Sequence, residues 1–377
     1  MPARGRSRVT AAQVANPYRI HALEALRASL MILGVVAHAL LILPFWFPKL
    51  SRSEAQFAAS IYNAIHVFRL PVYFVIAGFF AAWLYSRDGL RGFVVSRFKR
   101  LTSVLIVAQV AIAATFALVG CTVCEVAGGG GWWANAWLYL WFLYYLVLIS
   151  HGFVLVIWLA QTLAPRASAL VTAAVARLKF GPATTVVGAI LTALVPGIFN
   201  RDHVLILGEG LLPNGGLFAV YAIYFGLGWL VFIGGAWGAF RANLVWNSTI
   251  ACAFAMAIAL LPPQATSGLV GQIMGSGLGW FATATVIGLA FAVGNRPSRI
   301  LRYLDDASYW VYLWHAIPML AAAALLARVR IAPFWFVALC VVSSLIFSLG
   351  TYQLIVRNSI IGLWLSGRRR PTRRLTA

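Results

Sequence analysis

The stretch EALRASLMILGVVAHALLILPFWF, residues 24–47, is apolar over almost its whole length. A helix needs about 20 mostly apolar residues to cross the hydrocarbon core of a membrane, and this stretch is long enough. The same pattern recurs along the 377-residue chain, in which 62% of the side chains are apolar, 10% are charged and the mean hydropathy is +0.88. Soluble domains carry about a quarter charged residues, so the composition excludes a soluble single domain.

Ten apolar segments of this kind predict an all-α, polytopic integral membrane bundle with about ten transmembrane helices. They cover residues 24–47, 58–84, 101–120, 137–160, 183–200, 217–238, 243–262, 272–294, 308–326 and 332–355. The fifth is the weakest because Pro196 and Gly197 interrupt its end. We expect one transmembrane domain over 24–356, with a basic segment over 1–23 before it and a basic tail over 357–377 after it. The first apolar stretch is too long for a signal peptide, and no small-residue cleavage site follows it, so we expect a retained span.

The 29 Lys and Arg residues against eight Asp and Glu give a net charge of +21. On a soluble chain this excess suggests nucleic-acid binding, but here the basic residues lie in short islands between apolar runs. On the predicted topology 22 of them fall on one face and five on the other, which by the positive-inside rule places both termini in the cytoplasm. The charge therefore predicts a multi-pass membrane protein with cytoplasmic termini and no nucleic-acid partner. Arg27 and Arg69 remain, and both fall within apolar spans.

Four cysteines in a chain this long do not form a disulfide framework. Cys121 and Cys124 fall in a predicted outer loop, where an oxidising compartment would allow them to pair. Two unpaired cysteines explain the sequence equally well.

The first predicted span holds two ionisable residues on one helical face. Arg27 and His38 are eleven residues apart, which is three turns plus about 20° and about 16 Å along the axis. A charge near the bilayer centre costs at least about 2.5–3.5 kcal/mol, so such residues are functional candidates by default. The alternative for Arg27 is snorkelling to the inner interface, and the alternative for His38 is a core histidine bonded to a carbonyl.

Two further spans carry the same signal. His66 and Arg69 are three residues apart in the second span and share a helical face, and Arg69 lies too deep to snorkel easily. In the ninth span Ser308, Tyr312 and His315 form one stripe. An aromatic belt near the inner interface would explain the aromatic residues of this segment but explains His315 poorly.

The histidines lie on different predicted helices without short His, Cys or Asp spacing, so no metal site is predicted. The chain has no Gly-x-x-x-x-Gly-Lys-Ser/Thr phosphate loop and no Gly-x-Ser-x-Gly elbow. What remains is the chemistry of His and Arg. An imidazole can act as a general base near neutral pH, and arginines can bind phosphates or an oxyanion. His151 in the fourth span is isolated, and we expect it to be structural.

Five segments resemble signatures of the membrane-bound acyltransferase 3 family, in the family's order. Arg27 and His38 are similar to its first-span Arg-x10-His motif, and HVFRLPVYFVIAGFF at 66–80 resembles its second conserved span. RFKR at 97–100 resembles its Arg-x-x-Arg, and WFLYY at 141–145 and SYWVYLWH at 308–315 resemble two later signatures. Within the family the chain resembles the glucan biosynthesis protein C-like branch of succinyltransferases. Two positions depart from the family pattern, since Ala77 replaces a frequent Ser and Tyr139 replaces a frequent His.

The resemblance implies an O-acyltransferase that moves a succinyl or acetyl group from a cytoplasmic acyl-CoA to a hydroxyl of a periplasmic glycan. Acyl-CoA is then a substrate, no cofactor is bound permanently, and an osmoregulated periplasmic glucan is one candidate acceptor. CoA carries several phosphate charges, which basic side chains can bind. We expect the donor-binding residues to be Arg97, Arg100, Arg91, Lys99 and Tyr312.

In the expected mechanism His38 takes the proton from the acceptor hydroxyl, which attacks the thioester carbonyl. Arg27 or Arg69 stabilises the oxyanion or orients the thioester. His315 binds the acceptor or assists proton movement, and His66 completes the predicted catalytic set. The leading alternative is a transporter or flippase of a glycan or lipid precursor, since intramembrane His and Arg also mark substrate paths. A structural subunit of a glycan-synthesis complex is a third candidate, and the sequence leaves the oligomeric state open, a homo-oligomer included.

Overall fold

A computed structural model describes residues 20–47, 50–118, 140–195, 213–262, 268–329 and 331–366, and within these ranges the chain is helical, with no strand. The helices run in the order α1 (His21–Trp46), α2 (Arg52–Arg97), α3 (Ser103–Leu118), α6 (Trp141–Leu163), α7 (Pro165–Arg177), α8 (Pro182–Ala193), α9 (Gly215–Gly234), α10 (Trp237–Ala242), α11 (Leu244–Leu260), α12 (Gly268–Val293), α13 (Arg299–Trp314), α14 (Ala316–Leu326), α15 (Pro333–Thr351) and α16 (Ile360–Ser366). Two π-helical turns, η3 (Phe98–Thr102) and η4 (Tyr352–Val356), extend α2 and α15.

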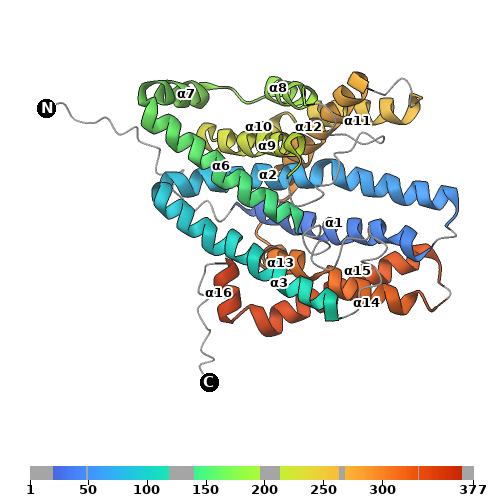
Figure 1. The fold of residues 1–377 in the computed structure, drawn as a ribbon. Helices are drawn as coiled ribbons and strands as arrows, with labels where there is room; N and C mark the ends of the chain where they lie inside the picture. The colour runs from blue at the N-terminus through green and yellow to red at the C-terminus, as the bar shows by residue number, and fades with distance from the viewer. Residues whose placement is uncertain are drawn as a thin grey trace.

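Helices α1 and α2 lie side by side in the middle of the bundle (Figure 1). The C-terminal helices α13, α14 and α15 pack against α1, whereas α6, α9 and α12 pack against α2. Helices α8, α10 and α11 pack on α12, further from the centre. The buried apolar residues form three clusters, centred on α2 with α9, on α1 with α13 to α15, and on α3 with α6.

Two glycines allow α2 and α9 to approach closely. A Cβ atom added to Gly78 would overlap the carbonyl of Phe225, and one added to Gly228 would overlap the carbonyl of Val75. Small residues that bring helix backbones together are typical of membrane helix interfaces, where lipid provides no hydrophobic drive for association.

Helix α2 is longer than the predicted second span. Its start is fixed by a capping box in which the Ser51 hydroxyl accepts from the backbone N–H of Glu54 and the Glu54 carboxylate accepts from that of Ser51. Gly89, with φ 65°, bends the helix, a backbone conformation that favours glycine. The basic residues after position 84, predicted to lie in a loop, are therefore helical, and the helix continues through η3 into α3.

Each of the ten predicted apolar segments contains a helix, but fewer of these helices are long enough to span a membrane. Six described helical segments have the required length and hydropathy, counting α2 with α3 as one. A seventh is obtained if α13 and α14, which meet at a 62° bend, form one broken span. Helices α8, with 12 residues, and α11, with 17, are apolar but shorter. The structure is therefore that of a multi-pass membrane protein, and the count of ten spans stays a prediction.

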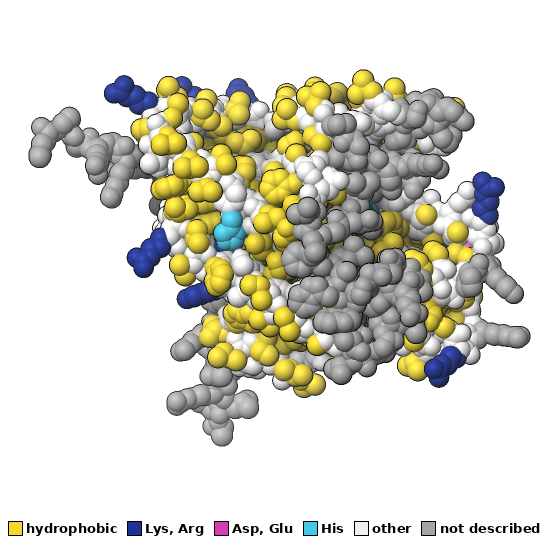
Figure 2. All heavy atoms as spheres, viewed as in Figure 1, with side chains coloured by type: hydrophobic (Ala, Val, Ile, Leu, Met, Phe, Trp, Pro, Cys, Tyr) yellow, Lys and Arg dark blue, Asp and Glu magenta, His cyan; other side chains and the backbone are white. Residues whose placement is uncertain are grey.

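The surface of the bundle agrees with a lipid environment. Apolar side chains cover much of the visible face, and Lys and Arg lie toward its edges (Figure 2). Large apolar residues are strongly exposed on several helices, for example Leu163 at 79% and Val245 at 79%. Soluble proteins rarely expose apolar patches on this scale.

Candidate functional site

One face of α1 carries three successive positions of the candidate site. Arg27, Gly34 and His38 recur at helical spacing on this face, and each meets a different partner. Arg27 contacts Asp305 on α13, the side chain of Arg69 from α2 lies over Gly34, and His38 contacts His315. The expected common face of Arg27 and His38 is therefore where three helices meet.

His38 and His315 form a close pair, although 277 residues separate them in the chain. His38 Nδ1 lies 2.6 Å from His315 Nε2, and the two rings stack with centroids 4.9 Å apart and planes 5° from parallel. His315 is buried, with 2% of its surface exposed. It stands at the junction of α13 and α14, where the chain bends by 62°.

The surroundings of His315 determine which of its nitrogens carries the proton. Its Nδ1 lies 2.9 Å from the carbonyl oxygen of Val311 and 3.0 Å from that of Tyr312. A carbonyl only accepts, so the neutral His315 ring must donate from Nδ1, and its Nε2 is then the acceptor. Ser344 on α15 donates to the His315 carbonyl at 2.7 Å and fixes the junction from the other side.

The proton between the two rings must then belong to His38. Since His315 Nε2 accepts, His38 Nδ1 is the donor, and the neutral His38 ring has its lone pair on Nε2. This is the tautomer that a general base requires, and a hydrogen bond to the other nitrogen sets it, as is common for functional histidines.

Arg69 is a buried cation without a carboxylate partner among the described residues. It is 8% exposed, and a Cβ atom added to Gly34 would lie 2.6 Å from its terminal nitrogen NH1. Among the described residues its Nε has no hydrogen-bond partner, and no carboxylate of this part of the chain lies within ion-pair distance. Because Gly34 and His38 are four residues apart, the guanidinium lies about one helical turn from the His38 side chain. The site thus places a positive charge beside the histidine pair.

The surroundings of Arg69 are polar but neutral. Tyr62, Tyr73, Tyr221 and Tyr312 all lie within electrostatic range of its charge. These hydroxyls are polar but uncharged, so they do not neutralise the positive charge of Arg69. An anion, either a carboxylate or a developing oxyanion, would complete the site electrostatically.

Arg27 is held in a different way. Its Nε and NH2 donate to the two carboxylate oxygens of Asp305 at 2.6 and 2.7 Å, and its guanidinium lies 5.2 Å from the centre of the Phe80 ring. The Tyr73 hydroxyl donates to the Arg27 carbonyl at 3.4 Å. This bidentate pair joins α1 to α13. Asp305 was not among the predicted site residues because the ninth span was expected to begin at 308, after the Asp305–Asp306 pair.

The remaining predicted interior residues lie around the same centre. His66 is buried at 3% exposure and stacks on Tyr62, with ring centroids 5.3 Å apart. Tyr312 packs edge-on against Phe142 at 5.8 Å. Tyr312 was predicted to bind the donor with the basic residues, but it lies in the interior near Arg69, one turn before His315.

The predicted donor-binding arginines and lysine lie together where α2 turns into α3. Arg91, Lys99 and Arg100 are exposed, and Arg97 is half-buried with its guanidinium 5.4 Å from the centre of the Phe93 ring. The Tyr309 hydroxyl of α13 donates to the Arg100 carbonyl at 3.1 Å. Six residues later on α13 comes His315, about 9 Å along the helix axis. One helix therefore links the basic turn to the histidine pair.

Other predicted residues lie elsewhere. His151 bonds to the Val147 carbonyl of its own helix at 2.8 Å, which agrees with a structural role. Cys121, Cys124 and Tyr139 are outside the described residues, whereas Cys252 and Cys340 are free thiols. Across the described ranges, no group of three His, Cys, Asp or Glu residues is placed to hold a metal ion.

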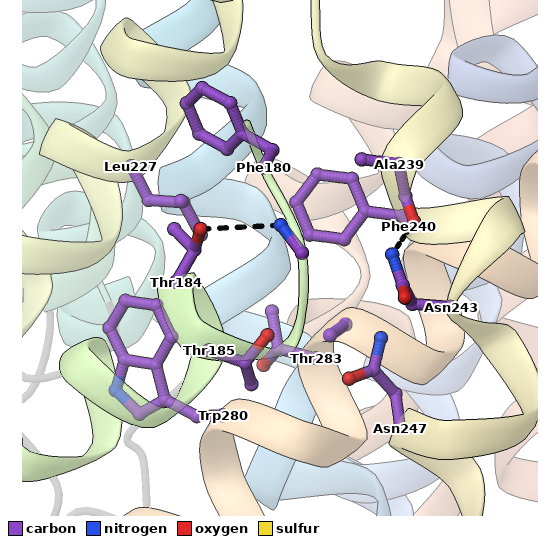
Figure 3. Close-up of a pocket in the computed structure, with 12 residues that line it drawn as sticks. Phe180, Thr184, Thr185, Leu227, Ala239, Phe240, Asn243, Asn247, Trp280 and Thr283 are labelled. Atoms are coloured by element: carbon purple, nitrogen blue, oxygen red, sulfur yellow. Dashed lines mark hydrogen bonds between the residues drawn. The ribbon is translucent and has the colours of Figure 1, made fainter. Parts of the chain in front are cut away.

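A small pocket, with room for about one or two water-sized groups, lies apart from this centre, where α9, α10 and α12 meet the first turns of α8 and α11 (Figure 3). None of the predicted site residues lines it. Aromatic rings and neutral polar side chains make up most of its wall: Phe180, Phe240, Trp280, Thr184, Thr185, Thr283, Asn243 and Asn247.

Comparison with known proteins gives one match. A family model described as an acyltransferase domain matches residues 20–353, which is nearly the whole described chain. No curated protein and no solved structure matches the chain.

Proposed function

The chain belongs to this acyltransferase family, and we propose that it transfers an acyl group from a cytoplasmic acyl-CoA to a hydroxyl of an extracytoplasmic glycan. The observation that carries the proposal is the pairing of His38 with His315 about one helical turn from the uncompensated charge of Arg69. A base and an anion-binding group side by side are what acyl transfer to a hydroxyl requires. The family match does not favour the transporter alternative.

In the proposed reaction His38 Nε2 takes the proton of the acceptor hydroxyl. The hydroxyl oxygen attacks the thioester carbonyl carbon, and a tetrahedral intermediate forms. The C–S bond then breaks, the ester remains on the acceptor, and the proton passes from His38 to the departing CoA thiolate. Throughout the cycle His38 Nδ1 continues to donate to His315 Nε2, so His315 orients the base and stabilises its protonated form.

Arg69 is the proposed oxyanion-binding residue. Its guanidinium has donors that no described carboxylate occupies, and removal of one such donor costs about 10²–10³ in rate in well-studied acyl-transfer enzymes. Two of the Arg27 donors are already engaged by Asp305. We therefore assign Arg27 to holding α1 against α13 and Arg69 to the reaction centre.

The donor is proposed to enter from the basic turn. Arg91, Arg97, Lys99 and Arg100 supply the positive charge that CoA phosphates require. Tyr309, bonded to this turn, and His315 lie six residues apart at the C-terminal half of α13, so the phosphates and the thioester would contact the same part of this helix. The family branch suggests a succinyl group and a periplasmic glucan acceptor in a bacterial inner membrane. The distal carboxylate of a succinyl group would be a second candidate ligand for Arg69.

The contacts between α1 and α13 bear on the proposed topology. Arg27 meets Asp305 and His38 meets His315, so the two helices run parallel. Parallel helices require an odd number of crossings between them. The ten-span prediction has seven. With α2 and α3 counted as two crossings joined at the basic turn, α2, α3, α6, α9 and α12 alone give five, so the parallel course agrees with both counts.

The test is acceptor-dependent release of CoA by the purified, reconstituted protein. We expect His38→Ala to abolish acyl transfer from labelled succinyl-CoA or acetyl-CoA to a glucan while the protein still accumulates in the membrane. The matched control is His151→Ala, which removes a membrane histidine whose hydrogen bond runs to the Val147 carbonyl of its own helix. Near-normal transfer by His38→Ala would disprove the base assignment, and glycan movement without CoA release would indicate a transporter.

A further inference from the structure

The pocket between α8 and α11 contains a buried polar group to which no described residue donates a hydrogen bond. Helix α11 is apolar and exposes Val245 and Trp246, yet it buries Asn247 at 2% exposure. The Asn247 Oδ1 has no hydrogen-bond partner in the described part of the chain. Figure 3 shows its amide facing the pocket, beside Thr283. A buried amide oxygen without a donor is costly, so the pocket is suited to a ligand that supplies one.

The wall of the pocket defines the chemistry of that ligand. The Thr185 hydroxyl also lines it, and the aromatic rings of Phe240 and Trp280 form apolar walls. No charged side chain is among its lining residues. An asparagine amide and threonine hydroxyls accept from and donate to hydroxyl groups, whereas a phosphate inside an uncharged pocket would lack a counter-charge. The interior therefore fits a hydroxyl-bearing group.

Positive charge adjoins two of the lining residues in the chain instead. Lys179 precedes Phe180 and Arg241 follows Phe240, and both basic side chains are exposed. Both fall on the predicted cytoplasmic face, where the membrane surface carries anionic lipids. The exposed apolar residues of α8 and α11, such as Val187 and Val245, offer a surface for acyl chains beside the same pocket.

We propose that this pocket binds an anionic phospholipid whose head group ends in hydroxyls. A terminal hydroxyl enters the pocket and donates to Asn247, while the phosphate remains outside with Lys179 and Arg241. The acyl chains lie against α8 and α11, which are shorter than a full span. This site is separate from the histidine pair, so it does not depend on the proposed acyltransferase activity.

Native mass spectrometry of the detergent-solubilised full chain tests the proposal with three probes. Phosphatidylglycerol has the phosphate and the hydroxyls, phosphatidic acid has the phosphate alone, and phosphatidylethanolamine has no net charge. We expect phosphatidylglycerol to bind best. Asn247→Leu, which keeps the branched outline of the side chain but removes the amide, should reduce the preference for phosphatidylglycerol over phosphatidic acid about threefold to tenfold. Combined Lys179→Gln and Arg241→Gln substitutions should weaken both anionic lipids and leave phosphatidylethanolamine unchanged.

Thr249→Val is the matched control, because Thr249 is an exposed polar residue on the same helix. It should leave all three affinities unchanged. If Asn247→Leu does not accumulate, Thr185→Val tests the same hydroxyl contact. Competition by free glycerol or glucose at equal concentration would assign the pocket to a soluble polyol rather than a lipid. Equal binding of the three lipids, or a preference that survives Asn247→Leu, would overturn the proposal and leave a pocket filled with water only.

Discussion

Substitution of Gly34 tests the position of Arg69 without removing any functional group. A Cβ atom at residue 34 would lie 2.6 Å from Arg69 NH1, about 0.8 Å closer than ordinary van der Waals contact at 3.4 Å. Gly34→Ala must therefore displace the guanidinium by nearly 1 Å. In a well-aligned active site a displacement of about 1 Å can cost about 10²-fold in rate. We expect a loss of this order in kcat for CoA release, with little change in KM for the acyl donor.

The same substitution should not destabilise the helix, since alanine is favoured over glycine in a helix interior by about 1 kcal/mol. Thermal unfolding in detergent therefore separates an effect on the site from a folding defect. Gly152→Ala is the matched control, because its added Cβ atom meets nothing within 4 Å. If Gly34→Ala retains full kcat, Arg69 does not act at the position that the structure gives it, and the oxyanion assignment is wrong.

Three other sets of substitutions test the histidine pair, the ion pair and the topology. His315→Phe should lower kcat about 10²–10⁴-fold because His38 loses the acceptor that fixes its tautomer. His315→Gln restores an acceptor and should recover part of the lost kcat, so an equal loss in both variants would contradict the tautomer argument. Asp305→Asn should lower the free energy of unfolding by about 3 kcal/mol by leaving the Arg27 charge unpaired, and the double variant Arg27→Met with Asp305→Leu should regain most of it in chemical denaturation. The variant Arg328→Cys, in a background without the native cysteines, should react with an impermeant maleimide added to the outer side. Arg52→Cys should react in the same way, and Arg91→Cys should not. Labelling of Arg328→Cys only from the cytoplasm would exclude the parallel topology.

The long apolar helices could be predicted from the sequence because apolar composition over about 20 residues decides them locally. The ends of α2 and α13 could not. The basic residues after position 84 suggested a loop, but Gly89 accommodates the bend and the helix continues to Arg97. Likewise α13 begins at Arg299, well before its apolar part, so Asp305 is already helical. Charge marks where a chain leaves the apolar core, and not where a helix ends.

The candidate site was predictable in its residues but not in its pairings. Arg27, His38, Arg69 and His315 were each recognisable as ionisable groups inside apolar runs. The contact between His38 and His315 is a feature of the tertiary structure, because it depends on how α13 packs against α1 and on the bend at His315. Sequence spacing along single helices carries no information about such contacts.

Helices α1 and α13 are joined by two contacts, the Arg27–Asp305 ion pair and the histidine pair, and both depend on the same alignment of the two helices. Arg27 and His38 are eleven residues apart on α1, and their partners Asp305 and His315 are ten apart on α13. At 1.5 Å per residue these separations are about 16 and 15 Å, so one helix register satisfies both contacts. A slide of one helix along the other by a single residue would break the ion pair and move the rings apart by about 1.5 Å. The bidentate Arg27–Asp305 contact therefore sets the distance between the histidines, and it would act on the proposed reaction centre from three turns away.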